Sequence, residues 1–203
     1  MRGLVIHEFG PISTHRIEEF DDPIAGKGEV IIDVHAIGLN FPDTLMVQGK
    51  YQMWPDRPFI PGRDASGVIS SIGSGITKLK VGDRVACQVL WGAFGDKVCA
   101  PETKVFKLPK EIDFISAAGM ITTYNTAHVA IYERGNIQPG ETVFITGASG
   151  GVGLAMVELA KARGATVLAG TTSKEKGNIA IAHGADYWID LSVENLHENV
   201  KKN

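Results

Sequence analysis

A glycine-rich turn between an apolar strand and an amphipathic helix constrains the fold of this chain more than any other feature. The apolar run TVFIT at residues 142–146 leads into GASGGVG at residues 147–153, and a helix-compatible run follows. The turn fits the G-x-G-x-x-G fingerprint with alanine in the first place, so that Ala148, Gly150 and Gly153 occupy the fixed positions. A turn of this kind directs the backbone amides at the start of a helix towards an anion.

The turn therefore predicts a site for the pyrophosphate of a dinucleotide. Gly150 would let the backbone approach the pyrophosphate, and Gly153 would let the helix pack closely on the strand. The predicted cofactor-binding residues of the turn are Ala148, Ser149, Gly150, Gly151, Val152 and Gly153. The alternative is a tight strand-to-helix turn that binds no ligand. The flanking strand, the amphipathic helix and a second strand at the expected distance favour the dinucleotide.

The end of the second strand predicts which dinucleotide binds. An acidic residue there would bind the ribose hydroxyls of NAD, whereas this sequence reads AGTTSKEK at residues 169–176. Hydroxyl groups and lysine charge favour the additional phosphate of NADPH. The predicted contacts are Thr171, Thr172, Ser173 and Lys176, with Lys174 as a further cation. The alternative is a solvated, lysine-rich helix start, which Glu175 leaves open.

Two different patterns divide the chain. Short β-rich runs separated by proline and glycine fill its first part, which is typical of a compact barrel or sandwich. These runs lie at residues 4–6, 29–37, 65–72, 84–89 and 95–100. Strands and helices alternate in the second part, which indicates a parallel sheet covered by helices. The strands are expected at residues 142–146, 165–169 and 187–190, and the helices at residues 150–163 and 174–183.

A helix is predicted to connect the two parts. Asp113 can cap it, and the helical pattern continues, with a break near Thr122, to Arg134, after which Gly135 ends it. We therefore predict an α/β chain with two domains. A β-barrel domain occupies residues 1–119, and the first half of a Rossmann-type NADP-binding domain occupies residues 120–203.

Composition and charge favour small-molecule partners. The chain has 203 residues, 44% of them hydrophobic, and a formal net charge of -3, with its 20 Lys and Arg scattered. A nucleic-acid or membrane surface needs a concentrated basic face, so neither partner is expected. The N-terminal segment lacks the apolar core of a signal peptide, so we expect a cytoplasmic protein. Cys87 and Cys99 are expected to be buried thiols without a chemical role.

Five motifs together resemble the medium-chain dehydrogenase/reductase superfamily, and within it the zinc-independent, zeta-crystallin-like quinone oxidoreductase branch. They are GLNFPD at residues 38–43, PGRDASG at 61–67, VGDRV at 81–85, QPGE at 138–141 and the glycine turn at 147–153. The resemblance implies that the first domain is a GroES-like barrel. It also implies metal-free hydride transfer from NADPH to a quinone or to the β-carbon of an α,β-unsaturated carbonyl compound.

The metal-ligand positions of the zinc-dependent relatives are altered in this chain. Zinc alcohol dehydrogenases of the superfamily have a cysteine near the position of Asn40, a His-Glu pair where Arg63 and Asp64 stand, and a lobe with four cysteines. Arginine cannot bind zinc, and the chain has two cysteines and six dispersed histidines. We therefore expect no metal, and surface or packing roles for the histidines.

The resemblance also implies three catalytic-site residues. Asn40 is expected close to the nicotinamide, Tyr51 in the acceptor pocket and Thr126 near the nicotinamide amide. The alternatives are a turn-stabilising amide for Asn40, loop packing with Trp54 for Tyr51, and an ordinary helix position for Thr126. Relatives often have a tyrosine after the third strand, near the adenosine phosphate, but this chain reads Ile-Asp-Leu at residues 189–191, so part of that contact is expected to be lost.

The sequence contains three of the strands that a complete dinucleotide domain needs. The third strand is followed by a polar segment with a thin apolar stripe at Val193, Leu196 and Val200, which predicts a helix. We therefore expect a chain truncated within the Rossmann domain, with weak or no NADPH turnover by itself. The alternative to a reductase is a non-catalytic fragment or remnant. It would bind nucleotide weakly, or pair with a second chain, including a copy of itself, through an uncovered sheet edge.

Overall fold

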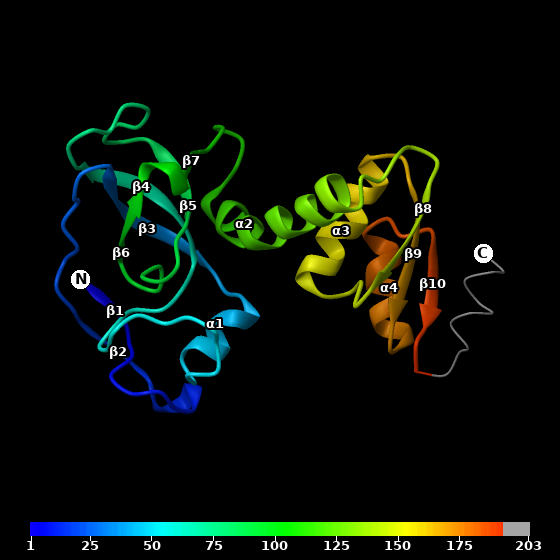
Figure 1. Cartoon of the computed structure of the whole chain (residues 1–203), viewed down its shortest axis with the longest axis horizontal. Coiled ribbons are helices and arrows are strands. Elements are labelled where there is room, and N and C mark those ends of the chain that lie inside the picture. Colours follow the sequence, from blue (N-terminus) through cyan, green and yellow to red (C-terminus); the bar gives the residue numbers. More distant parts are fainter. Residues whose placement is uncertain (193–203) are drawn as a thin grey trace. The chain divides into compact units, whose positions relative to one another are not determined.

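The structure of the chain is a computed structural model that describes residues 1–192 (Figure 1). It divides into two compact units, Met1–Thr122 and Thr123–Asn203. The boundary lies inside helix α2 (Phe114–His128). The predicted helix with Val193, Leu196 and Val200 lies outside the described residues, and the domain division between residues 119 and 120 stays a prediction.

An antiparallel sheet forms most of the first unit. Its five strands lie in the order β6-β3-β4-β5-β7. Their bounds are Glu29–Gly38 for β3, Asp64–Ile72 for β4, Arg84–Gln88 for β5, Lys97–Pro101 for β6 and Val105–Lys107 for β7. The pairing of β3 with β4 shifts register between Ile31 and Ile32 and between Val34 and Ala36. Irregularities of this kind bend and twist a strand, which allows the sheet to curve around a core.

Smaller elements complete the first unit. Strands β1 (Arg2–Val5) and β2 (Arg16–Glu19) form a separate antiparallel pair. The short helices are η1 (Ile12–Thr14), α1 (Phe41–Met46) and η2 (Glu102–Lys104). The sequence pattern predicted β1, β3, β4, β5 and β6 but missed β2, β7 and α1. The three residues of β7 give too short a pattern to recognise, and β2 is exposed along its whole length, so it lacks the apolar alternation of a half-buried strand.

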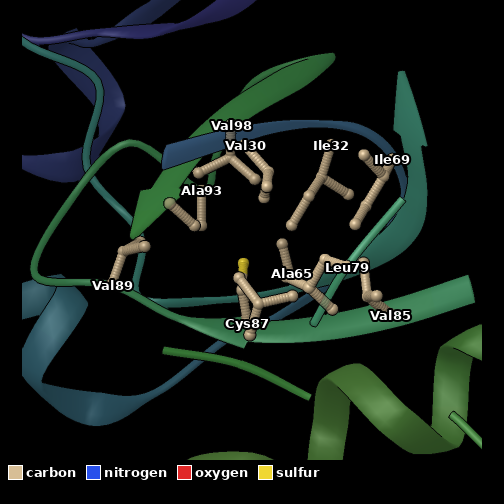
Figure 2. Packing of buried hydrophobic residues seen from close by; sticks show 12 residues of the cluster. Val30, Ile32, Ala65, Ile69, Leu79, Val85, Cys87, Val89, Ala93 and Val98 are labelled. Atoms are coloured by element: carbon tan, nitrogen blue, oxygen red, sulfur yellow. The ribbon is translucent and has the colours of Figure 1, made fainter. Parts of the chain in front are cut away.

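The core of this sheet is a cluster of aliphatic side chains (Figure 2). Val30 and Ile32 of β3 point towards Ala65, Val85 and Cys87, and each of these five side chains is fully buried. Burial of a valine or isoleucine side chain stabilises a fold by about 1.5–3 kcal/mol. The cluster therefore holds the strands whose ends lead into the candidate site. Burial also raises the pKa of the Cys87 thiol to about 12, so that this free cysteine stays protonated.

The first half of helix α2 packs directly on the ends of β3 and β4. A Cβ atom added to Gly38 would lie 2.3 Å from the carbonyl oxygen of Ala118, so no larger residue fits at the end of β3. Ser66 of β4 donates a hydrogen bond of 2.6 Å to the carbonyl oxygen of Phe114. Arg84 donates to the carbonyl oxygen of Ile112 at 2.6 Å, just before the helix. These contacts hold α2 next to the positions from which Asn40 and Asp64 extend.

Helix α2 continues through Thr122, so the predicted break there is wrong. The backbone changes geometry at Val129, where a π-helical segment, η3 (Val129–Arg134), begins. The amide and the hydroxyl of Thr122 both donate to the carboxylate of Asp64, at 3.1 and 2.9 Å. This contact with a distant strand uses the polar side chain without interrupting the helix. Gly135 ends the helical segment as predicted.

The second unit is a parallel sheet with its helices. Its strands lie in the order β10-β9-β8, and both strand pairs are parallel. The elements are β8 (Thr142–Thr146), α3 (Gly151–Ala162), β9 (Thr166–Thr171), α4 (Lys174–Ala182) and β10 (Tyr187–Asp190). Figure 1 shows α3 and α4 on the same side of the three strands, as right-handed connections between neighbouring parallel strands require. The predicted fold class is confirmed.

Three polar contacts hold the helices of the second unit in place. Tyr124 of α2 donates a hydrogen bond to the carboxylate of Glu158 on α3, and the Nδ1 atom of His183 lies 2.6 Å from the other oxygen of that carboxylate. Both bonds hold the pKa of Glu158 below its ordinary value. Lys161 pairs with Asp186 at 2.7 Å.

Within the described part of the chain, no helix is long and apolar enough to cross a membrane.

Candidate functional site

The glycine turn joins β8 to α3 with the geometry that its fingerprint predicts. Gly147 has a φ of +62°, a conformation that side chains other than glycine rarely adopt. The amide of Gly150 donates to the carbonyl oxygen of Gly147 at 3.0 Å, which closes the turn. Gly150 then stands at the N-cap of α3 with extended backbone angles. The first amides of the helix have no acceptor within the helix and can donate to an anion.

The three fixed positions of the turn serve different purposes. A Cβ atom on Gly153 would lie 2.3 Å from the carbonyl oxygen of Gly147, so its absence allows the helix to pack on the strand. A Cβ atom on Gly150 would meet only that same oxygen, at the ordinary contact distance of 3.4 Å. Gly150 therefore leaves open space beside the backbone. The side chain of Ala148 is fully buried, so this residue can contact a ligand only through its backbone.

The loop after β9 combines buried and exposed polar groups. Thr171 is buried, and its hydroxyl accepts a hydrogen bond from the indole of Trp188 at 2.6 Å and donates to the carbonyl oxygen of Ser173 at 3.2 Å. Ser173 caps α4 by accepting from the amide of Lys176. Thr172, Lys174 and Lys176 are exposed beside them, as is Glu175. Exposed hydroxyl and ammonium groups at the start of a helix fit a phosphate, although Thr171 itself is engaged within the protein.

The end of β10 lacks the tyrosine that relatives often have. Asp190 accepts hydrogen bonds from the amide and the hydroxyl of Ser192, at 2.9 and 2.7 Å. Both bonds lower the pKa of Asp190. The carboxylate is therefore engaged with the residues that follow the strand.

A polar cluster lies at the ends of β3 and β4 in the first unit. Asn40 precedes α1, and its backbone amide donates to the carboxylate of Asp43 at 2.8 Å. The side-chain amide of Asn40 donates to Asp64 at 2.9 Å. Asp64 also accepts the two hydrogen bonds from Thr122, and Gln88 donates to the Thr122 hydroxyl at 2.9 Å. The amide nitrogen of Asn40 is thus held by the protein, which directs its oxygen away from Asp64.

Tyr51 is held from another side of the same cluster. Arg63, the neighbour of Asp64 in the chain, donates a hydrogen bond of 3.0 Å to the phenolic oxygen of Tyr51. A guanidinium group can only donate, so the phenolic proton of Tyr51 stays available for a further acceptor. The ring of Tyr51 packs against a small cluster that includes Met46 and Phe59. Packing and polar contact therefore both fix this side chain.

Asp43 has the most perturbed carboxyl group of the cluster. Its side chain is buried, and burial raises its pKa to about 6. The nearby carboxylate of Asp64 also raises this pKa, whereas the hydrogen bond from the Asn40 amide and the charge of Arg63 lower it. One oxygen of Asp43 has no hydrogen-bond partner among the described residues. Asp43 therefore changes its charge state near neutral pH.

A cavity of about 400 Å³ opens next to this cluster. Arg63 and Gln88 line it together with the apolar side chains of Leu90 and Trp91. The other lining residues are Glu29, Val89, Cys99, Pro101 and Lys104. Tyr51 does not line it, but Arg63 contacts both the cavity and the Tyr51 phenol.

The predicted catalytic residues are distributed over both units. The structure brings Asn40 and Tyr51 to one polar cluster in the first unit, and it places Thr126 at an exposed position of α2 in the second. Sequence reasoning missed Asp43, Gln88 and Thr122 and considered Arg63 and Asp64 only as altered metal positions. Asp43 could have been found, because Asn40 and a carboxylate three residues later form a helix-capping pattern. Gln88 and Thr122 gave no signal, because only the fold brings them to Asp64.

The described residues contain no cluster of three or more His, Cys, Asp or Glu that could hold a metal ion. The histidines make dispersed contacts. His7 pairs with Glu18, His35 stacks against Phe114, and His128 stacks against Tyr132.

The fold and the turn define a class of protein in which a GroES-like antiparallel sheet precedes a Rossmann-type parallel sheet. The Alcohol dehydrogenase GroES-like domain family matches residues 26–110. A quinone oxidoreductase-like protein 2 homolog of Nematostella vectensis is 38% identical over 91% of this chain and 51% of its own length. The human synaptic vesicle membrane protein VAT-1 homolog is 31% identical over 100% of this chain and 52% of its own length.

Solved structures agree with these relatives. The crystal structure of Escherichia coli quinone oxidoreductase complexed with NADPH matches with a TM-score of 0.93 and 30% identity, over 100% of this chain and 62% of that one. The chain belongs to the quinone oxidoreductase and VAT-1 branch of the medium-chain dehydrogenase/reductase superfamily, and it corresponds to the N-terminal part of those proteins. It spans about half the length of the curated relatives described here.

The raised pKa of Asp43 predicts a pH-dependent loss of stability. Its ordinary pKa is 3.8, so the folded protein binds this proton more tightly than the unfolded chain. The contribution to stability is present at low pH and is lost as the pH rises from 3.8 through about 6. Relative to Asp43→Asn, which keeps an acceptor for the Asn40 amide, the unchanged protein should lose up to about 3 kcal/mol between about pH 4 and pH 7.

Urea unfolding at both pH values measures this difference. Asp56→Asn, at an exposed position, is the matched control and should follow the unchanged protein. Equal pH profiles for Asp43→Asn and the unchanged protein would contradict the assignment.

Proposed function

We propose that the chain binds NADPH and contributes to a metal-free quinone oxidoreductase or enone reductase. The observation that supports this most directly is the turn at residues 147–153, where Gly150 leaves open space beside a helix start. A relative of the same fold was crystallised with NADPH at 30% identity over the whole of this chain. NADPH, when bound, would supply a hydride to a quinone or to the β-carbon of an enone.

The second unit would hold the adenosine and pyrophosphate parts of the cofactor. The amides of Gly151, Val152 and Gly153 lie in the first turn of α3 and would donate to the pyrophosphate. Ser149 belongs to the same turn. Thr172, Ser173 and Lys176 would bind the additional phosphate of NADPH, with Lys174 adding positive charge. No acidic residue stands at the end of β9 to repel that phosphate.

The first unit would orient the acceptor. Arg63 donates to Tyr51, so the phenolic hydroxyl can donate a hydrogen bond to the oxygen that becomes negatively charged during reduction. Asp64 holds the amide nitrogen of Asn40, and its oxygen, which caps α1 by accepting from the backbone amide of Asp43, has a second lone pair that would accept from a ligand amide. Arg63 connects Tyr51 to the neighbouring cavity, where the ring of Trp91 would offer a flat apolar surface to a planar acceptor and Leu90 adds apolar contact. Thr126 stays a cofactor-side candidate on the resemblance alone.

A second candidate function is a non-catalytic nucleotide-binding or pairing protein. The observation that favours it is the position of β8, which is the last strand at one side of the sheet in the described residues. An edge of this kind offers unpaired backbone groups to another strand.

NADPH consumption with a simple quinone separates the two functions. The chain alone should bind NADPH and should oxidise it weakly or not at all. Any turnover should fall at least about tenfold in Tyr51→Phe, because the phenolic donor is lost, and should not change when a chelator is added. Weak turnover that falls in Tyr51→Phe supports the reductase, binding without any turnover leaves the non-catalytic function for the chain by itself, and the absence of both binding and turnover contradicts the proposal. Robust turnover would contradict the expectation of weak activity.

The two glycines of the turn should respond differently to alanine. Gly150→Ala has room for its methyl group, so the thermal unfolding midpoint should stay nearly constant while NADPH affinity falls by about tenfold or more. Gly153→Ala places a methyl group 2.3 Å from a carbonyl oxygen, so it should lower stability by about 1–3 kcal/mol and weaken binding as well. Circular dichroism and fluorescence titration measure both quantities. Full NADPH affinity in Gly150→Ala would contradict the proposed pyrophosphate site.

A further inference from the structure

Trp188 makes a specific polar contact with the end of the neighbouring strand. Its indole Nε1 atom donates a hydrogen bond of 2.6 Å to the hydroxyl of Thr171. Thr171 is the last residue of β9, and only 2% of its surface is exposed. The indole ring is half-buried on β10, the strand paired with β9. A buried hydroxyl with a partner on a rigid aromatic ring has a fixed position.

The indole ring also determines how closely helix α4 approaches. A Cβ atom added to Gly177 would lie 2.3 to 2.5 Å from three atoms of the Trp188 ring. Only glycine therefore fits at this position of the helix. Trp188 consequently contacts the elements on both sides of the loop between β9 and α4. Its nitrogen binds Thr171 at the end of β9, and its ring lies against Gly177 in the first turn of α4.

A chain of hydrogen bonds continues from Trp188 into this loop. A threonine hydroxyl has one proton to donate, and the indole can only donate. The Thr171 proton is therefore directed to the carbonyl oxygen of Ser173, at 3.2 Å. The hydroxyl oxygen of the same residue, Ser173, accepts from the amide of Lys176 at 3.4 Å, which caps α4. Backbone bonds also hold this segment, because the amide of Leu191 donates to the carbonyl oxygen of Thr171 at 2.7 Å and the amide of Gly177 donates to that of Ser173 at 2.9 Å. The indole of Trp188 fixes the direction of the Thr171 hydroxyl.

We propose that Trp188 is a positioning residue that selects NADPH by fixing the loop at residues 171–176. It does not contact the cofactor phosphate and acts through Thr171. Thr172, Ser173 and Lys176 can bind a phosphate together only if the loop holds them in one arrangement, because a mobile loop loses conformational entropy on binding. The inference rests on the proposed NADPH site and adds the residue that determines its specificity.

Two nucleotides that differ by the phosphate in question test the inference. Adenosine 2′,5′-bisphosphate contains the phosphate that distinguishes NADPH, and adenosine 5′-monophosphate lacks it. Calorimetric titration of the full chain should show tighter binding of the bisphosphate. Trp188→Phe and Thr171→Val should each weaken bisphosphate binding by about tenfold and monophosphate binding by less than about twofold. Thr171→Ser keeps the hydroxyl and should keep the preference.

Matched variants and outcomes separate positioning from general stability. Thr166→Val, at the other end of β9, is the control and should bind both nucleotides as the unchanged protein does. A merely structural role would weaken both nucleotides equally in Trp188→Phe and Thr171→Val, and that result would overturn the inference. A retained preference in both variants would also overturn it, while the NADPH site would stand. If the unchanged protein shows no preference, the proposed NADPH site fails and the inference fails with it.

Discussion

The close approach of α3 to β8 is the constraint on which the rest of the second unit depends. Gly153 allows it, because any side chain there would collide with the carbonyl oxygen of Gly147 at 2.3 Å. The approach sets the direction of the helix start, and the direction of its amides determines where an anion can lie. Gly150 then keeps that position accessible. One steric requirement therefore produces both the packing of the parallel sheet and the candidate site for pyrophosphate.

The first unit contains two buried carboxyl groups, those of Asp43 and Asp64, which must be stabilised by the residues around them. Asp64 is stabilised by three hydrogen bonds from Asn40 and Thr122. Asp43 receives one from the Asn40 amide, and its burial raises its pKa to about 6. The same contacts fix Asn40, while Arg63 fixes Tyr51. Asn40, Arg63 and Asp64 stand where the resemblance places metal ligands in zinc-dependent relatives. In this chain they form a network of hydrogen bonds with one guanidinium group.

Local patterns in the sequence were sufficient for the order of the large elements and for the glycine turn. They succeeded because alternation, helix period and glycine positions are local properties of the chain. They failed at Thr122, where the sequence pattern predicted a break but helix α2 continues. The polar groups of Thr122 bind Asp64 instead of interrupting the helix. They also missed the partners of Thr171, because the contact with Trp188 depends on the pairing of β9 with β10. The cofactor and catalytic roles of the named residues stay predictions.

The most direct test of the central claim is amide hydrogen exchange of the chain with and without NADPH. We expect slower exchange in two segments, residues 147–154 and 171–177, because one contains the turn and the other the loop after β9. The barrel strands β5 and β6 should exchange at unchanged rates. Protection confined to the barrel strands, or no change in either segment at saturating NADPH, would contradict the claim that this turn and this loop bind the cofactor.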